Sequence, residues 1–145
     1  MIPEFQQNGF LEEGIYETSF SEMEEKLGFS RKRRKLLSAM KTLITYCKYL
    51  QCDVLYIDGS FVSTKISPAD YDACWDTTAT DKEPIMNAVE QSSLNSDSES
   101  QKEEFGGEIY PAFVKAPLNH GMTILEYFQT IKDGEGKKGI IKLKL

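Results

Sequence analysis

Two aspartates that alternate along the chain, Asp70 and Asp72, are the residues best suited to chemistry in this 145-residue sequence. Residues i and i+2 of a strand point to the same face, so the two carboxylates would project together. Carboxylate oxygens at this spacing suit a hard divalent cation, Mg²⁺ or Mn²⁺.

Roughly ten residues earlier stands the pair Gly59 and Ser60. Glycine permits a tight turn and a close approach of backbone amides to phosphate oxygens, and serine adds a hydroxyl donor. The segment therefore predicts a site for a metal ion and a phosphorylated ligand.

Two apolar segments on either side of this motif predict the strands that must position it. Residues 54–57 lead into the glycine turn, and residues 73–75 follow the aspartates. Residues 107–114 predict a third strand, in which Pro111 indicates a sheet edge or an early break, because proline has no amide hydrogen to donate. Residues 138–145 alternate between polar and apolar side chains and predict a closing strand.

Helix signals precede and follow these strands. Ser19 or Ser21 can cap a short helix with acidic residues in its early turns. Ser30 then caps a longer helix that runs to about Leu50, whose apolar residues recur at spacings of three and four. Residues 123–131 also have helical character. The predicted helices supply apolar faces that must pack against the strands.

The composition changes between residues 76 and 104, where the chain is polar and rich in serine and acidic residues. Residues 84–89 predict a short helix, and residues 90–104 predict a flexible acidic insert. Apart from this insert, the pattern describes one domain over residues 1–145. The predicted fold class is α/β (α+β), a small mixed β-sheet flanked by helices.

Composition and charge exclude several function classes. No apolar stretch approaches the roughly 20 residues of a membrane span, and no secretory signal is recognisable, so we expect a cytoplasmic protein without membrane contact. The net charge of -6 argues against general affinity for nucleic acid. Three cysteines and one histidine leave little from which to build a disulfide framework, a zinc site or a Ser/Cys-His nucleophile.

A run of five basic residues, 31–35, begins the longer predicted helix. Positive charge is disfavoured at a helix N-terminus, so the run stands out locally. Two interpretations are open. The run is either a solvated helix face or a docking patch for RNA, nucleotide phosphates or an acidic partner.

An apolar strand, a Gly-Ser turn and an Asp-x-Asp pair in this order resemble the signature of the nucleotidyltransferase superfamily related to DNA polymerase beta. The sequence is also similar to a group of small bacterial nucleotidyltransferase-like proteins of toxin-antitoxin type. That similarity lies in residues 14–16 near the start, residues 59–65 in the middle, and residues 127–130 and 138–141 near the end. It covers most of the chain outside the acidic insert.

This resemblance implies a metal-dependent transfer of a nucleoside monophosphate from a nucleoside triphosphate to a hydroxyl group. The two aspartates would be catalytic metal ligands and the Gly-Ser turn would hold the triphosphate. Lys65 is either a further phosphate contact or a solvated loop residue. Members of the superfamily usually carry a third catalytic carboxylate on a later strand that helps to bind the metal. Glu108 is the first candidate for it, and Asp76 is the alternative.

The acceptor stays open between RNA, a protein side chain and a small molecule. Family context implies a protein partner in a two-component, toxin-antitoxin-type system. One alternative is a catalytically weak nucleotide-binding or antitoxin-like protein-interaction module. Another is a metal-free structural domain in which the aspartates are exposed on a hairpin for solubility.

Overall fold

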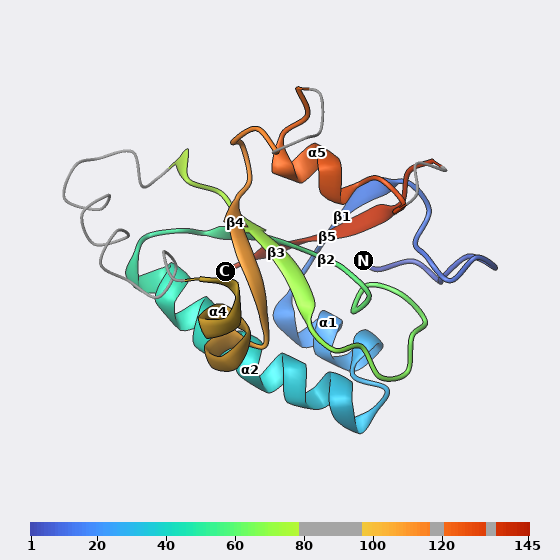
Figure 1. Ribbon diagram of the computed structural model, residues 1–145. Helices are drawn as coiled ribbons and strands as arrows, with labels where there is room; N and C mark the ends of the chain where they lie inside the picture. Colours follow the sequence, from blue (N-terminus) through green and yellow to red (C-terminus); the bar gives the residue numbers. More distant parts are fainter. Residues whose placement is uncertain (79–96, 117–120, 133–135) are drawn as a thin grey trace.

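A five-stranded mixed β-sheet forms the centre of the protein, which the computed structural model describes over residues 1–78, 97–116, 121–132 and 136–145. The strands lie in the order β1-β5-β2-β3-β4 (Figure 1). Their bounds are β1 Gly14–Thr18, β2 Val54–Asp58, β3 Tyr71–Trp75, β4 Gly107–Pro111 and β5 Gly139–Lys144. Strand β1 is parallel to β5 and β3 is parallel to β4, whereas β2 is antiparallel to both of its neighbours. The predicted mixed sheet is confirmed, and Pro111 lies on an edge strand as expected.

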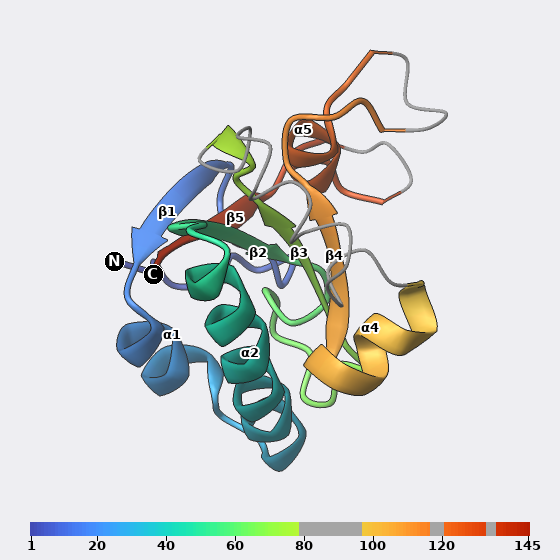
Figure 2. The ribbon, with the colours of Figure 1, turned by 90° about the vertical axis from the view of Figure 1, so that its left-hand side faces the viewer.

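Helices cover both faces of this sheet. Three of them, α1 (Phe20–Leu27), α2 (Arg31–Tyr49) and α4 (Ser98–Phe105), lie on one face, and α5 (Ile124–Phe128) lies on the other (Figures 1 and 2). Within the described ranges, no helix is long and apolar enough to cross a membrane.

Side-chain caps explain where these helices begin. Ser19 and Ser30 accept hydrogen bonds from backbone amides in the first turns of α1 and α2, which confirms the two predicted caps. Thr123 and Glu126 form a reciprocal capping box at the start of α5. Local sequence therefore determines the position of each of these helix starts.

Strand alternation divides the core into two layers. Leu55 and Ile57 of β2 belong to the larger cluster, which they share with α1, α2 and α4. Val54 and Tyr56 point the other way and pack in the smaller cluster with α5. Because Asp58 follows Tyr56 by two residues, the last residue of β2 also faces the side of the sheet that carries α5.

Helix α4 corrects the prediction of a flexible acidic insert at residues 90–104. Asp97 caps this helix, and Phe105 is buried beside α2, where its ring meets that of Tyr46 edge to face. The prediction was wrong for residues 98–104 because only two side chains of α4 are buried, which leaves too weak an apolar pattern to indicate a helix.

The other buried side chain of α4, Gln101, attaches the helix to the edge of the sheet. Its amide accepts a hydrogen bond from the backbone N–H of Ile109 in β4 (3.0 Å) and donates one to the carbonyl of the same residue (3.4 Å). An exposed strand edge is thereby covered. The remainder of the predicted insert, residues 90–96, and the short helix predicted at 84–89 lie outside the described residues.

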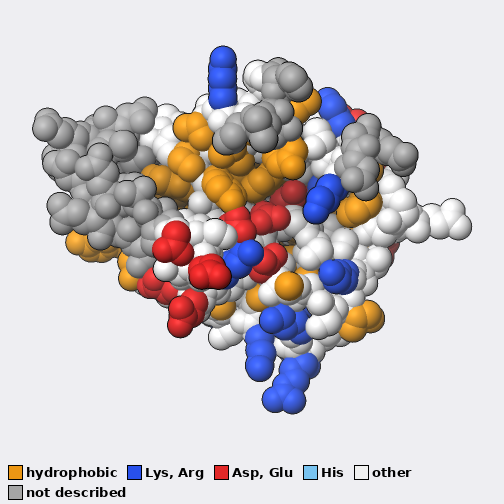
Figure 3. All heavy atoms as spheres, in the orientation of Figure 1, with side chains coloured by type: hydrophobic (Ala, Val, Ile, Leu, Met, Phe, Trp, Pro, Cys, Tyr) orange, Lys and Arg blue, Asp and Glu red, His pale blue; other side chains and the backbone are white. Residues whose placement is uncertain are grey.

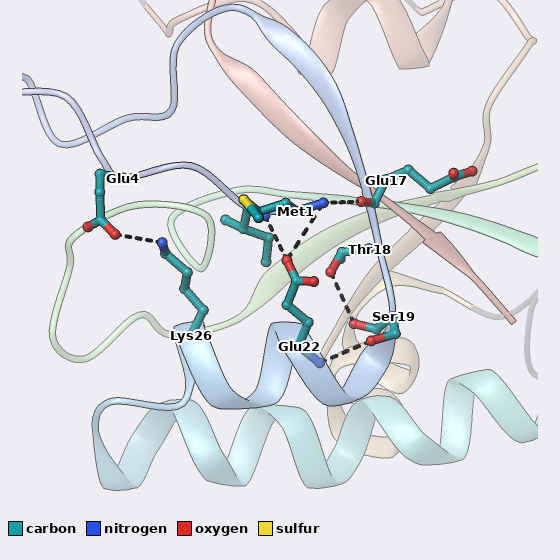
Figure 4. Close-up of polar contacts among 8 residues, drawn as sticks. Met1, Glu4, Glu17, Thr18, Ser19, Glu22 and Lys26 are labelled. Atoms are coloured by element: carbon teal, nitrogen blue, oxygen red, sulfur yellow. Dashed lines mark hydrogen bonds and ion pairs between the residues drawn. The ribbon is translucent and has the colours of Figure 1, made fainter.

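The N-terminal segment is tied to β1 and α1 (Figure 4). The amino group of Met1 donates to the carbonyl of Glu17 (2.8 Å), and the backbone N–H of Ile2 donates to the carboxylate of Glu22 (2.8 Å). Farther along, the segment pairs through Phe10 with the loop that follows β2. The segment therefore reaches the end of the sheet where the predicted motif lies.

Candidate functional site

Three carboxylates stand side by side across the sheet, on the face that carries α5. Asp58 at the end of β2 is the register partner of Asp72 in β3, and Asp72 is the register partner of Glu108 in β4. Residues paired in this way lie about 5 Å apart, and like charges directly opposite one another are destabilising. We call Asp58, Asp72 and Glu108 the acidic row.

The predicted pair Asp70 and Asp72 comes together with Gly59 and Ser60 around one cavity of about 720 Å³. That volume lies in the range of about 300–1,000 Å³ that is typical of small-molecule sites. The cavity is lined by Phe10, Asp58, Gly59, Ser60, Asp70, Asp72, Tyr127, Phe128, Thr130, Ile131, Lys132 and Lys138. The spacing of the sequence motif therefore corresponds to a real convergence in space.

Gly59 lies directly against the acidic row. Its φ is +83°, in the left-handed region, and a Cβ there would stand 2.8 Å from Oδ2 of Asp72 and 3.1 Å from the backbone nitrogen of Asp72. The carbonyl of Gly59 accepts a hydrogen bond from the N–H of Val62, which closes the turn. The glycine is required both by the turn and by the close approach of the carboxylate.

Arg33 holds the loop that follows this glycine. The side chain is fully buried, and its guanidinium donates to the carbonyls of Phe61 (2.7 Å), Ser63 (2.5 Å) and Lys65 (2.9 Å). It also stacks on the ring of Phe29, 4.0 Å from the centroid. Burial lowers the pKa of Arg33 to about 10, so the guanidinium stays charged at neutral pH.

The basic run at residues 31–35 is therefore not a uniform surface. Arg33 points into the protein, whereas Arg31, Arg34 and Lys35 are exposed. Neither interpretation of the run anticipated that its central residue would support the loop next to the acidic row.

Lys65 takes part in the site through its backbone. Its carbonyl accepts the hydrogen bond from Arg33, while its side chain is exposed and is not among those that line the cavity. Its predicted contact with phosphate is therefore not supported by its position.

A second lysine, Lys138, faces Asp58. Its ammonium nitrogen lies 3.3 Å from Oδ1 of Asp58, an atom that is buried and has no hydrogen-bond partner among the described residues. Burial raises the pKa of Asp58 to about 7, although the charge of Lys138 opposes this shift. The carboxylate at this end of the row is thus only partly compensated.

At the other end of the row, Lys102 of α4 joins two carboxylates. Its ammonium nitrogen lies 3.0 Å from Oε1 of Glu108 and 3.4 Å from Oδ2 of Asp70. The other oxygen of Glu108 accepts a hydrogen bond from the hydroxyl of Tyr110. These contacts, with the Tyr110 hydrogen bond first, hold the pKa of Glu108 below its ordinary value.

Asp72, in the middle of the row, has no such partner. No ammonium or guanidinium group of the described segments lies within 4.0 Å of its carboxylate. Burial and the nearby charges of Asp70 and Glu108 raise its pKa to about 6. Negative charge is therefore in excess at the centre of the site.

Aromatic and aliphatic side chains form the wall of the cavity opposite these acids. Tyr127 and Phe128 come from α5, and Phe10 and Ile131 complete the wall. The space-filling view shows acidic side chains gathered in the middle of this face, below a band of hydrophobic side chains (Figure 3). The cavity can therefore bind a ligand with one charged end and one flat, apolar part.

Two of these acids can hold a hard divalent cation when water or a phosphorylated ligand fills its other coordination positions. In the part of the chain that the structure describes, no three acidic, histidine or cysteine side chains converge closely enough to hold a metal ion by themselves. Asp70 and Asp72 nevertheless offer carboxylate oxygens beside a glycine turn. Mg²⁺ is commonly held by one or two carboxylates together with substrate phosphates.

Asp76, the alternative third carboxylate, lies at the opposite end of β3. Its backbone N–H donates to the carbonyl of Val54, and its carboxylate accepts from the N–H of Thr78. It therefore caps the end of the strand and does not line the cavity.

Several residues of the site were missed by reasoning from sequence. Asp58 carried the clearest signal, because it ends an apolar strand immediately before Gly59. Lys102 lay within the predicted insert, and Lys138 opens the closing strand. Both lysines depend on strand order and helix docking, which the local pattern does not reveal.

Comparison with known proteins gives one match. The model of a family of unknown function, DUF6932, matches residues 3–144. Neither the curated proteins nor the solved structures contain a match to the chain.

Proposed function

We propose that this chain, which belongs to the family of unknown function DUF6932, is a metal-dependent nucleotidyltransferase. It would move a nucleoside monophosphate from a nucleoside triphosphate to a hydroxyl acceptor on RNA, on a protein or on a small molecule. The observation that carries the proposal is the excess of negative charge at Asp72, beside the Gly59 turn and inside a cavity with an aromatic wall.

Each part of the cavity has a role in this reaction. Asp70 and Asp72 would hold the divalent cation, Mg²⁺ or Mn²⁺, which when bound neutralises charge on the phosphates during transfer. The turn at Gly59 and Ser60 would hold the triphosphate through backbone amides and a hydroxyl. The wall that includes Tyr127 would receive the nucleobase by stacking.

Transfer of label from α-³²P-labelled nucleoside triphosphates tests this function. The four triphosphates are supplied with Mn²⁺, with bulk RNA and a cell extract as sources of acceptors, and pyrophosphate release is followed in parallel. Wild-type protein should transfer label, and Asp72→Asn should reduce transfer to background.

The matched control is Asp76→Asn, which removes a carboxylate from the other end of the same strand. It should transfer label at the wild-type rate. Transfer that survives Asp72→Asn would refute the proposed site.

A second candidate is a nucleotide-binding or antitoxin-like protein-interaction module with weak or no catalysis. The contacts of Lys102 with Asp70 and Glu108 favour it, because they occupy carboxylate oxygens that a catalytic metal would use. In that case the wild-type protein should bind a triphosphate with Mn²⁺ in calorimetry, and label should not be transferred to any acceptor. Co-purification of a stable protein partner would then support a two-component system.

We expect the protein to act in the cytoplasm. All three cysteines are free thiols, and buried free thiols are typical of a reducing compartment.

A further inference from the structure

Lys102 differs from an ordinary surface lysine because the helix that carries it is held against the sheet. It lies in the last turn of α4, where the helix dipole favours a cation, and the N–H of Gly106 caps its carbonyl. The neighbouring Gln101 holds the backbone of β4 with two hydrogen bonds, and Phe105 is fully buried. The backbone of Lys102 is therefore fixed relative to the acidic row.

From this position the ammonium group joins Asp70 to Glu108. It contacts Oδ2 of Asp70 and Oε1 of Glu108, so one positive charge is shared between two carboxylates. A divalent cation that bridged these two side chains would have to displace it. The second oxygen of Glu108 is already taken by the hydroxyl of Tyr110.

Glu108 therefore differs from the aspartates. Both of its oxygens have protein partners, whereas Asp72 faces no cation within 4.0 Å among the described residues and Oδ1 of Asp70 is not used by Lys102. The oxygens left for a metal are those of Asp72 and the second oxygen of Asp70. A lysine lies beside each end of the row, whereas among the described residues no cation lies within 4.0 Å of its middle carboxylate.

We propose that Lys102 takes the place of a second metal ion, because its ammonium group lies between Asp70 and Glu108, where a second divalent cation would otherwise bind. The site then holds one divalent cation, at Asp70 and Asp72. Glu108 positions Lys102 and does not bind the metal. This inference rests on the proposed function, because it concerns the same cation site. It assigns Glu108 a role different from the metal ligand that the sequence resemblance implies. The tethered ammonium places one positive charge beside Asp70 and Glu108, which a bound second cation would otherwise supply.

Counting bound Mn²⁺ tests the proposal without any need for turnover. The full chain is titrated with Mn²⁺ alone, and free Mn²⁺ is measured by electron paramagnetic resonance. Wild-type protein should bind one Mn²⁺, and Lys102→Met should bind two, because Asp70 and Glu108 are then released to bind a second ion. Lys102→Arg keeps the charge and should return the count to one.

Glu108→Gln separates the two roles of that residue. As a positioning residue its loss should leave one bound Mn²⁺, with affinity within a few-fold of wild type, whereas loss of a metal ligand should abolish binding. The matched control is Lys41→Met, which removes an exposed lysine that is 3.5 Å from Glu24 and is not among the residues that line the cavity. It should bind one ion, as wild type does. A melting curve by circular dichroism establishes that each variant is folded.

The outcomes distinguish this inference from the function on which it rests. Two Mn²⁺ ions on wild-type protein, or a single ion on Lys102→Met, would overturn the role of Lys102 and leave the cation site intact. Loss of the ion in Glu108→Gln would restore Glu108 as a ligand and also overturn the inference. Absence of bound Mn²⁺ in every variant would overturn both the inference and the proposed metal-dependent function.

Discussion

Two neighbouring parts of this protein bury charge in opposite ways. Arg33 is enclosed by α2 and the loop after β2, and backbone carbonyls accept hydrogen bonds from its guanidinium on several sides. Asp58 and Asp72 lie just before and just after the same loop. Among the described residues, Asp58 has a buried oxygen without a hydrogen-bond partner, and Asp72 has no cation within 4.0 Å, although Lys138 and Lys102 act on it from farther away.

The difference separates a structural charge from a functional one. A buried charge whose hydrogen bonds are satisfied holds the surrounding chain in one conformation. A buried charge left partly unsatisfied costs stability, and such sites are typical of places where a ligand binds. Arg33 thus fixes the loop, and under the proposed function the excess charge of the acidic row would serve a ligand held against that loop.

The largest expected effect comes from removing the satisfied charge. Arg33→Met should lower the free energy of unfolding by about 3 kcal/mol or more, because several buried carbonyls lose their donor at once. Urea denaturation measures this. Arg31→Met changes an exposed residue in the same helix and should cost less than about 0.5 kcal/mol. Equal losses of unfolding free energy in the two variants would show that the buried hydrogen bonds of Arg33 do not stabilise the protein.

Gly59→Ala should have the next largest effect, since it places a methyl group against Asp72. The positive φ alone costs about 1–2 kcal/mol, and the close contact adds to that cost. Gly121→Ala is the matched control, because Gly121 has φ +91° but no atom of the described residues within 4 Å of the added Cβ. Urea denaturation should show a larger loss for Gly59→Ala, and calorimetry should show loss of triphosphate binding in that variant alone. Equal stability losses would mean that the contact with Asp72 is unimportant.

Asp72→Asn should change stability in the opposite direction. In the presence of EDTA at pH 8 it should raise the free energy of unfolding by about 1–2 kcal/mol, because the variant no longer buries a charge that has no cation in direct contact. A loss of stability would show that the carboxylate is satisfied by the protein itself and would contradict the proposed role of the row.

The same variant has an expected pH dependence. Folding raises the pKa of Asp72 from 3.8 to about 6, so the native state holds the proton more tightly than the unfolded chain does. The contribution of Asp72 to wild-type stability should therefore decline as the pH rises from about 4 to about 6 and then level off. The advantage of Asp72→Asn should vanish below about pH 4. A difference in the free energy of unfolding between the two proteins that stays constant across this pH range would contradict the raised pKa of Asp72.

The smallest effect is expected at Lys65. Its side chain is exposed and only its carbonyl is used, so Lys65→Ala should change stability by less than about 0.5 kcal/mol and leave triphosphate affinity unchanged. Lys138→Ala, which removes a cavity-lining cation, should weaken triphosphate binding measured by calorimetry. A loss of triphosphate affinity in Lys65→Ala that exceeds the loss in Lys138→Ala would instead support Lys65 as the phosphate contact.

Sequence reasoning located the elements because their signals are local. The caps at Ser19 and Ser30 and the apolar strand before Gly59 are each readable within a few residues. Glu108 was placed on the strand that carries it, and the structure aligns it with Asp72. The alternation that brings Asp70 and Asp72 to one cavity is a property of extended backbone.

The rest of the site depends on contacts between distant segments. Lys138 reaches Asp58 only because β5 is inserted between β1 and β2, an order that no local pattern specifies. Lys102 reaches Glu108 only because α4 docks on the sheet edge, and that helix has too few apolar residues to be recognised. Arg33 was hidden within a basic run whose other members lie nearer the surface.

The most direct test of the account is a crystal structure of the protein soaked with Mn²⁺ and a non-hydrolysable nucleoside triphosphate analogue. We expect an anomalous peak between Asp72, Asp70 and the phosphates, with the phosphates against the turn at Gly59 and Ser60. A cation bound elsewhere, or a cavity that holds neither Mn²⁺ nor the analogue, would contradict it.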